Sequence, residues 1–164
     1  MHGRNASGGS GCYAVEEPAR RILSDTFAIP YRTGLQELPM LRERIRHVAE
    51  SLPFTDQELD DISLALVEGA TNAFRHGRPD HGDGHVLFEA YGTDDCFRVF
   101  ITDRGPGFDP DSIPEPDPNA LPEGGMGIFL MRSVMDAVIY RFEMGTTLEL
   151  VKYPSTSPDD RADA

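Results

Sequence analysis

The chain has 164 residues, a length that suits one domain with its own hydrophobic core. Its 28 acidic residues outnumber its 15 basic residues and give a net charge of −13, so the protein would be repelled by nucleic acids and by anionic membranes. Apolar residues make up 39% of the chain and charged residues 26%, as in a globular protein. We therefore expect no direct binding to nucleic acid or to a membrane.

The termini and the cysteines indicate the compartment and the domain bounds. No stretch approaches the roughly 18 apolar residues of a membrane span, and the first residues lack the hydrophobic segment of a signal peptide. Cys12 and Cys96 have no ligand spacing and are interpreted as two reduced thiols. These features predict a cytoplasmic protein. Residues 1–20 and 154–164 are predicted to be disordered tails around one domain over residues 21–153.

The first elements in chain order are a strand and two helices. Residues 27–30 suggest a short edge strand, since it ends in a proline. Apolar residues recur every three or four positions over residues 38–52, which predicts an amphipathic helix. A capping box, Thr55 with Glu58, begins a second helix, and Gly77 is its predicted C-cap. The apolar stripe of that helix consists of Leu59, Ile62, Leu66, Ala70 and Ala73.

The second half of the chain adds four strands and one helix. Residues 86–91 and 97–102 are rich in β-branched and aromatic residues and predict an antiparallel pair. A long Pro/Asp-rich segment over residues 104–123 follows, typical of a functional lid. A helix is expected from Gly127, and two more strands over residues 138–142 and 146–153. This order predicts an α+β fold, a two-layer sandwich with helices on one face of a mixed, mostly antiparallel sheet.

Glu68 and Asn72 lie four residues apart on the second helix and share one of its faces. The Asn72 amide offers a neutral oxygen suited to Mg²⁺, which usually binds few protein ligands together with substrate phosphates. Glu68, one turn earlier, can orient or deprotonate a hydroxyl that attacks a phosphate. An isolated pair of this kind is more typical of a solvated polar face, so the hypothesis depends on the neighbouring motifs.

Asp103 follows a predicted strand and precedes Gly105-Pro106-Gly107. A carboxylate there can accept a hydrogen bond from an exocyclic amine such as that of adenine, and the glycines let the backbone approach the ring. A tight turn after a strand is the alternative interpretation. By strand alternation Thr146 faces the core with Leu148, close to the same base, whereas Thr147 faces the other side.

Gly124-Gly125-Met126-Gly127 precedes an apolar helix. The free N–H groups and the positive dipole of a helix start favour an anion such as a phosphate. A flexible hinge at the end of the lid is the alternative.

Taken together and in this order, the motifs resemble the Bergerat ATP-binding fold of histidine kinases, gyrase-type topoisomerases, the ninety-kilodalton heat-shock chaperones and bacterial anti-sigma-factor serine kinases. The resemblance covers residues 24–153. It implies ATP and Mg²⁺ as cofactors, Asn72 as the metal ligand and Glu68 as the catalytic base. It implies a nucleotide-binding set made of Asn72, Asp103, Gly105, Gly107, Gly124, Gly125, Met126, Gly127, Thr146 and Thr147.

The sequence motifs themselves are most similar to those of the anti-sigma-factor kinases. The first 35 residues lack the helical hairpin of a histidine kinase, and His47 stands on a single short helix. Topoisomerases and chaperones need large additional domains. The resemblance therefore implies a serine/threonine kinase that binds a sigma factor and phosphorylates an anti-anti-sigma partner of the STAS type. It leaves room for a homodimer.

One departure from the resemblance keeps other functions open. The anti-sigma-factor kinases commonly carry an arginine in the lid before the phosphate loop, but residues 109–123 hold no basic residue. The first alternative is an ATP-binding module that holds its partner with little or no turnover, and the second is a switch kinase in a larger assembly. Arg104 or Arg132 are candidate substitutes for the missing charge.

Three histidines, His76, His81 and His85, lie near the end of the second helix without a repeated ligand spacing. We expect His76 to cap the helix C-terminus rather than to bind a metal, because the helix dipole favours a partly positive imidazole there.

Overall fold

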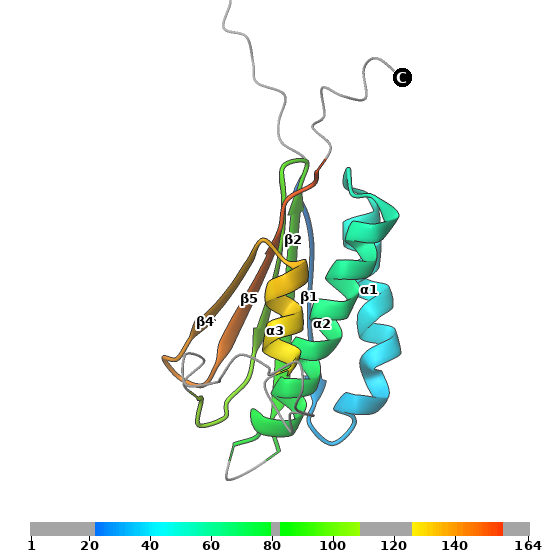
Figure 1. The fold of residues 1–164 in the computed structure, drawn as a ribbon. Helices are drawn as coiled ribbons and strands as arrows, with labels where there is room; N and C mark the ends of the chain where they lie inside the picture. The colour runs from blue at the N-terminus through cyan, green and yellow to red at the C-terminus, as the bar shows by residue number, and fades with distance from the viewer. Residues whose placement is uncertain (1–21, 80–82, 109–125, 156–164) are drawn as a thin grey trace, which may run out of the picture.

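Five strands form one sheet in the order β1-β2-β3-β5-β4, and the helices cover one of its faces (Figure 1). The structure is a computed structural model that describes residues 22–79, 83–108 and 126–155. The elements within those ranges are β1 (Leu23–Pro30), a 3₁₀ helix η1 (Gly34–Glu37), α1 (Leu38–Glu50), α2 (Asp56–His76), β2 (His85–Thr93), β3 (Cys96–Thr102), α3 (Met126–Val134), β4 (Ala137–Arg141) and β5 (Thr147–Lys152). The predicted α+β sandwich is confirmed.

All four strand pairings among the described residues are antiparallel. The sequence predicted a mixed, mostly antiparallel sheet. Because β3 also pairs with β5 in the antiparallel sense, the described sheet is entirely antiparallel. β1 is longer than predicted, since it pairs with β2 from Leu23 opposite Gly92 to Pro30 opposite His85. It lies at the sheet edge, where Pro30 needs no ladder partner for its missing N–H.

The helix α2 is fixed at both ends. Its capping box is complete, because Thr55 accepts from the Glu58 amide and the Glu58 side chain accepts from the Thr55 amide. Its C-cap is Gly77, as predicted. A Cβ at Gly69 would lie 2.7 Å from Leu148 and 2.9 Å from Ile101, so this glycine lets α2 lie directly on the sheet. The buried face of α2 and the inner face of the sheet form one core.

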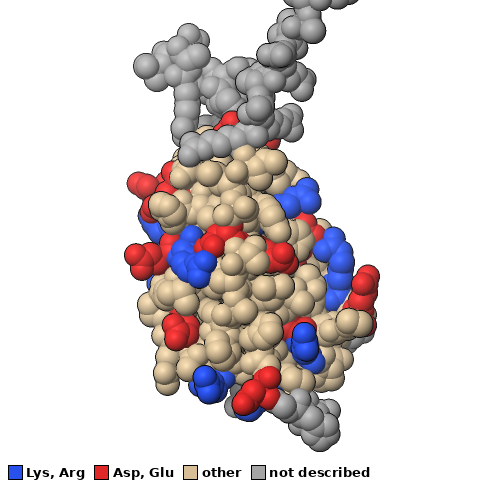
Figure 2. All heavy atoms as spheres, turned by 180° about the vertical axis from the view of Figure 1, so that it is seen from behind, with Lys and Arg blue, Asp and Glu red and all other residues tan. Residues whose placement is uncertain are grey.

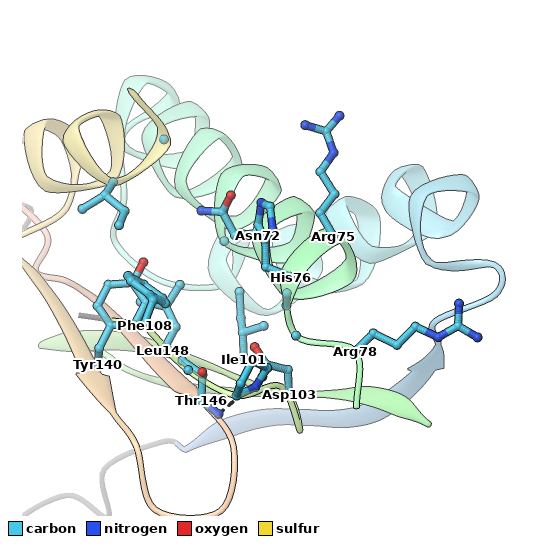
Figure 3. A pocket seen from close by; sticks show the side chains of 17 residues that line it. Asn72, Arg75, His76, Arg78, Ile101, Asp103, Phe108, Tyr140, Thr146 and Leu148 are labelled. Atoms are coloured by element: carbon cyan, nitrogen blue, oxygen red, sulfur yellow. Dashed lines mark hydrogen bonds between the residues drawn. The ribbon is translucent and has the colours of Figure 1, made fainter. Parts of the chain in front are cut away.

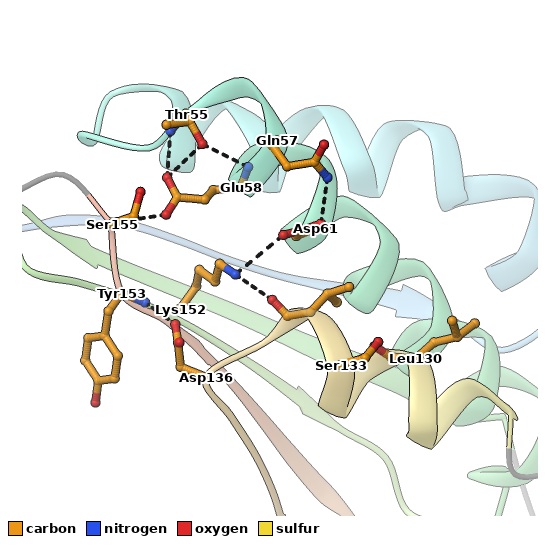
Figure 4. A network of polar contacts seen from close by, with 11 residues as sticks. Thr55, Gln57, Glu58, Asp61, Leu130, Ser133, Asp136, Lys152, Tyr153 and Ser155 are labelled. Carbon is orange, nitrogen blue, oxygen red and sulfur yellow. Dashed lines mark hydrogen bonds and ion pairs between the residues drawn. The ribbon is translucent and has the colours of Figure 1, made fainter. Parts of the chain in front are cut away.

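A polar network ties β5 and the described residues after it to the helices (Figure 4). The Lys152 ammonium donates to the Val134 carbonyl at 2.6 Å and pairs with Asp61 at 3.5 Å, which joins β5, α3 and α2. The Ser155 amide donates to Glu58 at 2.8 Å. Residue 155, which the sequence assigned to the C-terminal tail, is thus anchored to the start of α2, while residues 156–164 of that tail and residues 1–20 lie outside the described residues.

The face of the sheet opposite the helices carries charges of both signs, interspersed among other residues (Figure 2). On this face Glu149 is almost fully buried and pairs with Arg98 at 3.3 Å and Arg141 at 2.7 Å. Although the chain has a net charge of −13, its acidic residues do not form a single patch on this face. Among the described helices, none is long and apolar enough to cross a membrane.

Candidate functional site

A cavity of about 660 Å³ lies between α2, α3 and the inner face of the sheet. The predicted motifs meet there although they lie far apart in sequence: the lining includes Asn72 from α2, Asp103 and Gly107 after β3, Gly127 from α3 and Thr146 before β5. Ile101 and Leu148 from the sheet line it as well. Polar groups at several sides of a partly apolar cavity are typical of a small-molecule site.

Asp103 is the buried acid of this cavity, with 6% of its surface exposed. Its Oδ1 accepts hydrogen bonds from the amides of Gly105 at 2.9 Å and Thr146 at 3.3 Å, the second of which is drawn in Figure 3. The Asp103 amide donates in turn to the Thr146 carbonyl at 2.9 Å. Burial raises the pKa of the Asp103 carboxyl above its usual range, and the two amides offset part of that rise. The carboxylate is therefore held in a fixed orientation.

Two glycines let the backbone close around Asp103. A Cβ at Gly77 would lie 2.3 Å from the Asp103 Cγ, so the end of α2 packs directly on the carboxylate. Gly145 has a φ of +114° and a Cβ there would lie 2.1 Å from the Asp103 carbonyl oxygen. Any side chain at either position would displace the acid. The φ of −87° at Gly77 is one that other residues also adopt, so the backbone conformation does not require glycine. The close packing of Asp103 explains why a glycine ends α2.

The second polar group consists of Asn72 and Glu68, which face the first turn of α3. A Cβ added at Gly127 would lie 2.7 Å from Glu68 Oε2 and 3.6 Å from Asn72 Nδ2. The side chains of the predicted base and of the predicted metal ligand thus point at the predicted phosphate loop, where only glycine leaves them room. Asn72 and Gly127 line the cavity themselves.

The cavity rim carries two arginines that the sequence analysis missed, Arg75 and Arg78. Figure 3 shows both guanidinium groups extending outward from the rim. A signal for Arg75 existed: it follows Glu68 by seven residues and Asn72 by three, so all three belong to one helical stripe. Arg104 and Arg132, the substitutes named from the sequence, are not among the residues that line the cavity.

Aromatic residues form the side of the cavity beneath α3. The Phe108 ring lies edge-on to Tyr140 at 5.0 Å and to Phe142 at 5.6 Å, and Phe108 and Tyr140 lie together in Figure 3. The Tyr140 hydroxyl is buried and has no hydrogen-bond partner among the described residues. Burial raises the pKa of Tyr140 to about 12. This unpaired polar atom is an observation that a bound ligand or an ordered water would explain.

Several predicted residues lie elsewhere. Thr147 points to the open face, where its hydroxyl lies 3.1 Å from that of Thr102, so strand alternation separates it from the cavity. Met126 begins α3 but is 41% exposed and is not part of the lining. Gly124 and Gly125 lie outside the described residues. Gly105 supports the site from behind, because a Cβ there would lie 2.6 Å from the Gly77 Cα.

Of the three histidines near the end of α2, the structure describes His76 and His85, whereas His81 lies outside the described residues. His76 is exposed at the last residue of α2 and lines the cavity. Within the described ranges no group of three or more His, Cys, Asp or Glu side chains is arranged to hold a metal ion.

The residues present fit a magnesium nucleotide. A buried carboxylate accepts hydrogen bonds from a base, an amide oxygen is a ligand that Mg²⁺ tolerates, and the glycine at the start of α3 leaves room for phosphates beside Glu68. The acidic chain offers few cations, so backbone N–H groups and the metal would have to balance the phosphate charge.

Comparisons with known proteins identify the family and the fold. The sequence profile of the histidine kinase-like ATPase domain matches residues 33–152. The chain is 30% identical over 122 residues to the serine-protein kinase RsbW of Bacillus subtilis, and equally to that of Bacillus velezensis, with 70% of this chain and 76% of each relative covered. Its fold is similar to the crystal structure of the RsbU and RsbW domains of Rv1364c from Mycobacterium tuberculosis, with a TM-score of 0.58 and 16% identity. That likeness covers 80% of this chain and 32% of the other.

Proposed function

We propose that this chain, which belongs to the histidine kinase-like ATPase family, is an ATP-dependent serine/threonine protein kinase that also acts as an anti-sigma factor. The observation that supports this most directly is the meeting of Asp103, Asn72 and Gly127 at one cavity, from three segments far apart in sequence. The curated relatives named serine-protein kinase cover most of the same residues. Its partners in this proposal are a sigma factor and an anti-anti-sigma protein of the STAS type, which places its work in the cytoplasm.

In this proposal each side chain has one task. Asp103 accepts a hydrogen bond from the adenine amine, supported by Thr146 and by the backbone at Gly105 and Gly107. Asn72 holds Mg²⁺. Bound Mg-ATP would supply its γ-phosphoryl group to the serine or threonine oxygen of the protein substrate, with ADP as the leaving group, and Glu68 would accept the proton of that hydroxyl.

The phosphate end extends beyond the described residues. We propose that Gly124, Gly125 and Met126 contact phosphates through their backbone N–H groups together with Gly127, because a helix start favours anions. Thr147 is not included in this set, since its side chain faces the open sheet face.

We propose Arg75 as the cation that serves a phosphate in a chain whose lid lacks one, by turning its outward-pointing side chain over the cavity. It follows Asn72 by three residues on the same stripe and lines the cavity, and no ion pair within the described residues engages it. A guanidinium beside a transferring phosphoryl group stabilises the charge that develops there.

The lid over residues 109–123 contains no basic residue. This favours a second candidate function, an ATP-binding module that holds its partner without modifying it.

Intact-mass spectrometry separates the two functions. The protein is incubated with Mg-ATP and a candidate STAS-domain partner, and the partner mass is followed with time. A gain of about 80 Da, one phosphoryl group, supports the kinase. ATP binding and partner binding without any mass gain on cognate partners would favour the binding module.

A further inference from the structure

Tyr31, which the assigned roles leave out, joins two parts of the site through its hydroxyl group. It follows β1, and its hydroxyl donates a hydrogen bond of 2.5 Å to the carbonyl of Gly77, the C-cap of α2. The amide of Arg104, the residue after Asp103, donates to the same hydroxyl at 3.2 Å. One hydroxyl therefore bridges the end of α2 and the segment that carries the buried acid.

The Gly77 peptide is the wall against which the Asp103 carboxylate packs. Its α-carbon is so close that a Cβ there would lie 2.3 Å from Asp103 Cγ, and the Gly77 carbonyl also accepts the Arg104 amide at 3.2 Å. A shift of this peptide would move the wall and the acid relative to one another. The Tyr31 hydroxyl restrains this peptide through its hydrogen bond to the Gly77 carbonyl.

The Tyr31 side chain is itself firmly held. Its ring lies edge-on to Phe74 of α2, with the ring centroids 6.4 Å apart, and its amide donates to the Gly84 carbonyl at 3.2 Å. A Cβ at Gly84 would lie 3.0 Å from the ring, so the ring has little space to turn. Burial, and to a smaller extent the charge of Asp103, raises the pKa of Tyr31, so the hydroxyl remains a donor at neutral pH.

We infer that Tyr31 is a positioning residue for the base-binding carboxylate, and that its hydroxyl sets the selectivity of the site for adenine over guanine. This inference rests on the proposed function. The Tyr31 hydroxyl does not line the cavity, so it acts through Gly77 and Arg104 on Asp103. An acid that is free to shift accepts less well from the adenine amine, whereas a guanine base, which presents a carbonyl there, gains no such bond in either case.

The test compares Tyr31→Phe with three other proteins: the wild type, Asp103→Asn and Tyr91→Phe. Tyr91 is a matched control, because its hydroxyl also bonds, to Glu89 at 3.1 Å, but on the open sheet face. Dissociation constants for Mg-ATP and Mg-GTP are measured by titration calorimetry. We expect Tyr31→Phe to weaken ATP binding about 3- to 10-fold, the effect of one hydrogen bond. GTP binding should change less than about twofold, so the ATP preference falls, and Tyr91→Phe should match the wild type.

A second control variant tests the alternative explanation that any loss of packing near Phe74 weakens ATP binding. Phe74→Leu removes the ring contact of Tyr31 but keeps its hydroxyl, so it should lower the melting temperature and change the ATP preference much less than Tyr31→Phe does. The kcat at saturating ATP should stay within about twofold of wild type in Tyr31→Phe, while KM for ATP rises. An equal loss of ATP preference in Phe74→Leu would overturn the positioning role.

The outcomes distinguish the two proposals. If wild-type protein binds no ATP, or Asp103→Asn binds it as tightly as wild type, the proposed function fails and this inference fails with it. If Asp103→Asn loses ATP binding but Tyr31→Phe keeps both its ATP affinity and its ATP preference, only the role of Tyr31 is overturned.

Discussion

Gly77→Ala adds a single methyl group against the buried acid and is the sharpest test of the site geometry. The backbone at Gly77 has a φ of −87° and a ψ of 7°, a conformation that alanine adopts without much strain, so the change acts through the added atom. That atom would lie 2.3 Å from the Asp103 Cγ and 2.5 Å from its Cβ and Oδ2. The carboxylate or the end of α2 must therefore move.

The structure sets the size of that move. To reach ordinary contact at 3.4 Å from a distance of 2.3 Å, the two groups must separate by roughly 1 Å. A displacement of this size is enough to break the 2.9 Å bond from the Gly105 amide to Asp103. Overpacking of this kind costs about 1–3 kcal/mol of stability. The displaced carboxylate would also lose the proposed hydrogen bond from the adenine amine. A hydrogen bond to a charged acceptor is worth about 1.5–3 kcal/mol, so ATP affinity should fall roughly tenfold to a hundredfold.

The matched control is Gly92→Ala, whose new atom would lie 2.5 Å from the Leu52 Cδ1, far from the cavity. Both variants are compared by chemical denaturation and by titration with Mg-ATP. We expect both to lose stability and only Gly77→Ala to lose affinity. Wild-type affinity in a Gly77→Ala protein that is destabilised would refute Asp103 as the base-binding acid.

Three further changes test other parts of the site. Glu68→Gln should leave ATP and partner binding intact but slow phosphoryl transfer by roughly 10²–10⁴, and transfer at the wild-type rate in a radiolabel assay would return Glu68 to a solvated helix face. Asn72→Ala should abolish the Mg²⁺ dependence of nucleotide affinity, and an unchanged dependence in calorimetry would exclude it as the metal ligand. The pKa of Tyr140, raised to about 12 from 10.0, means that the folded protein keeps a proton which the unfolded chain loses. Stability from this group is therefore complete below pH 10 and falls towards pH 12, by up to about 1.4 kcal/mol per pH unit. Tyr140→Phe should remove that part of the fall and keep or raise stability at pH 7, and a clear loss at pH 7 in denaturant melts would show that the hydroxyl has a partner.

Features that depend on near neighbours in sequence were predictable. The capping box of Thr55 and Glu58 and the C-cap at Gly77 fixed the bounds of α2 to within a residue. The alternation around Leu148 correctly placed Thr146 inside and Thr147 outside. Local spacing suffices for these features because capping and strand alternation involve only residues a few positions apart.

The contacts between distant segments were not predictable. Nothing in the sequence near Tyr31 indicates that its hydroxyl meets Gly77, 46 residues later, or the amide of Arg104, 73 residues later. Tyr140 lies in an ordinary apolar strand pattern. Nothing in that pattern indicates that Phe108 packs against its ring or that its hydroxyl is buried without a partner among the described residues. Such features follow from how the helices pack on the sheet, which a single sequence does not encode in any local spacing.

The glycines of the site show why the two kinds of information must be combined. Gly107 and Gly145 have a positive φ of 76° and 114°, a backbone conformation that glycine adopts without steric cost. Gly77 and Gly127 have no such φ, and the space they leave is filled by Asp103 in one case and by Glu68 in the other. Their role is therefore to let a carboxylate approach the backbone. A substitution at either position should act on the nucleotide site through the displaced acid, not through a strained turn.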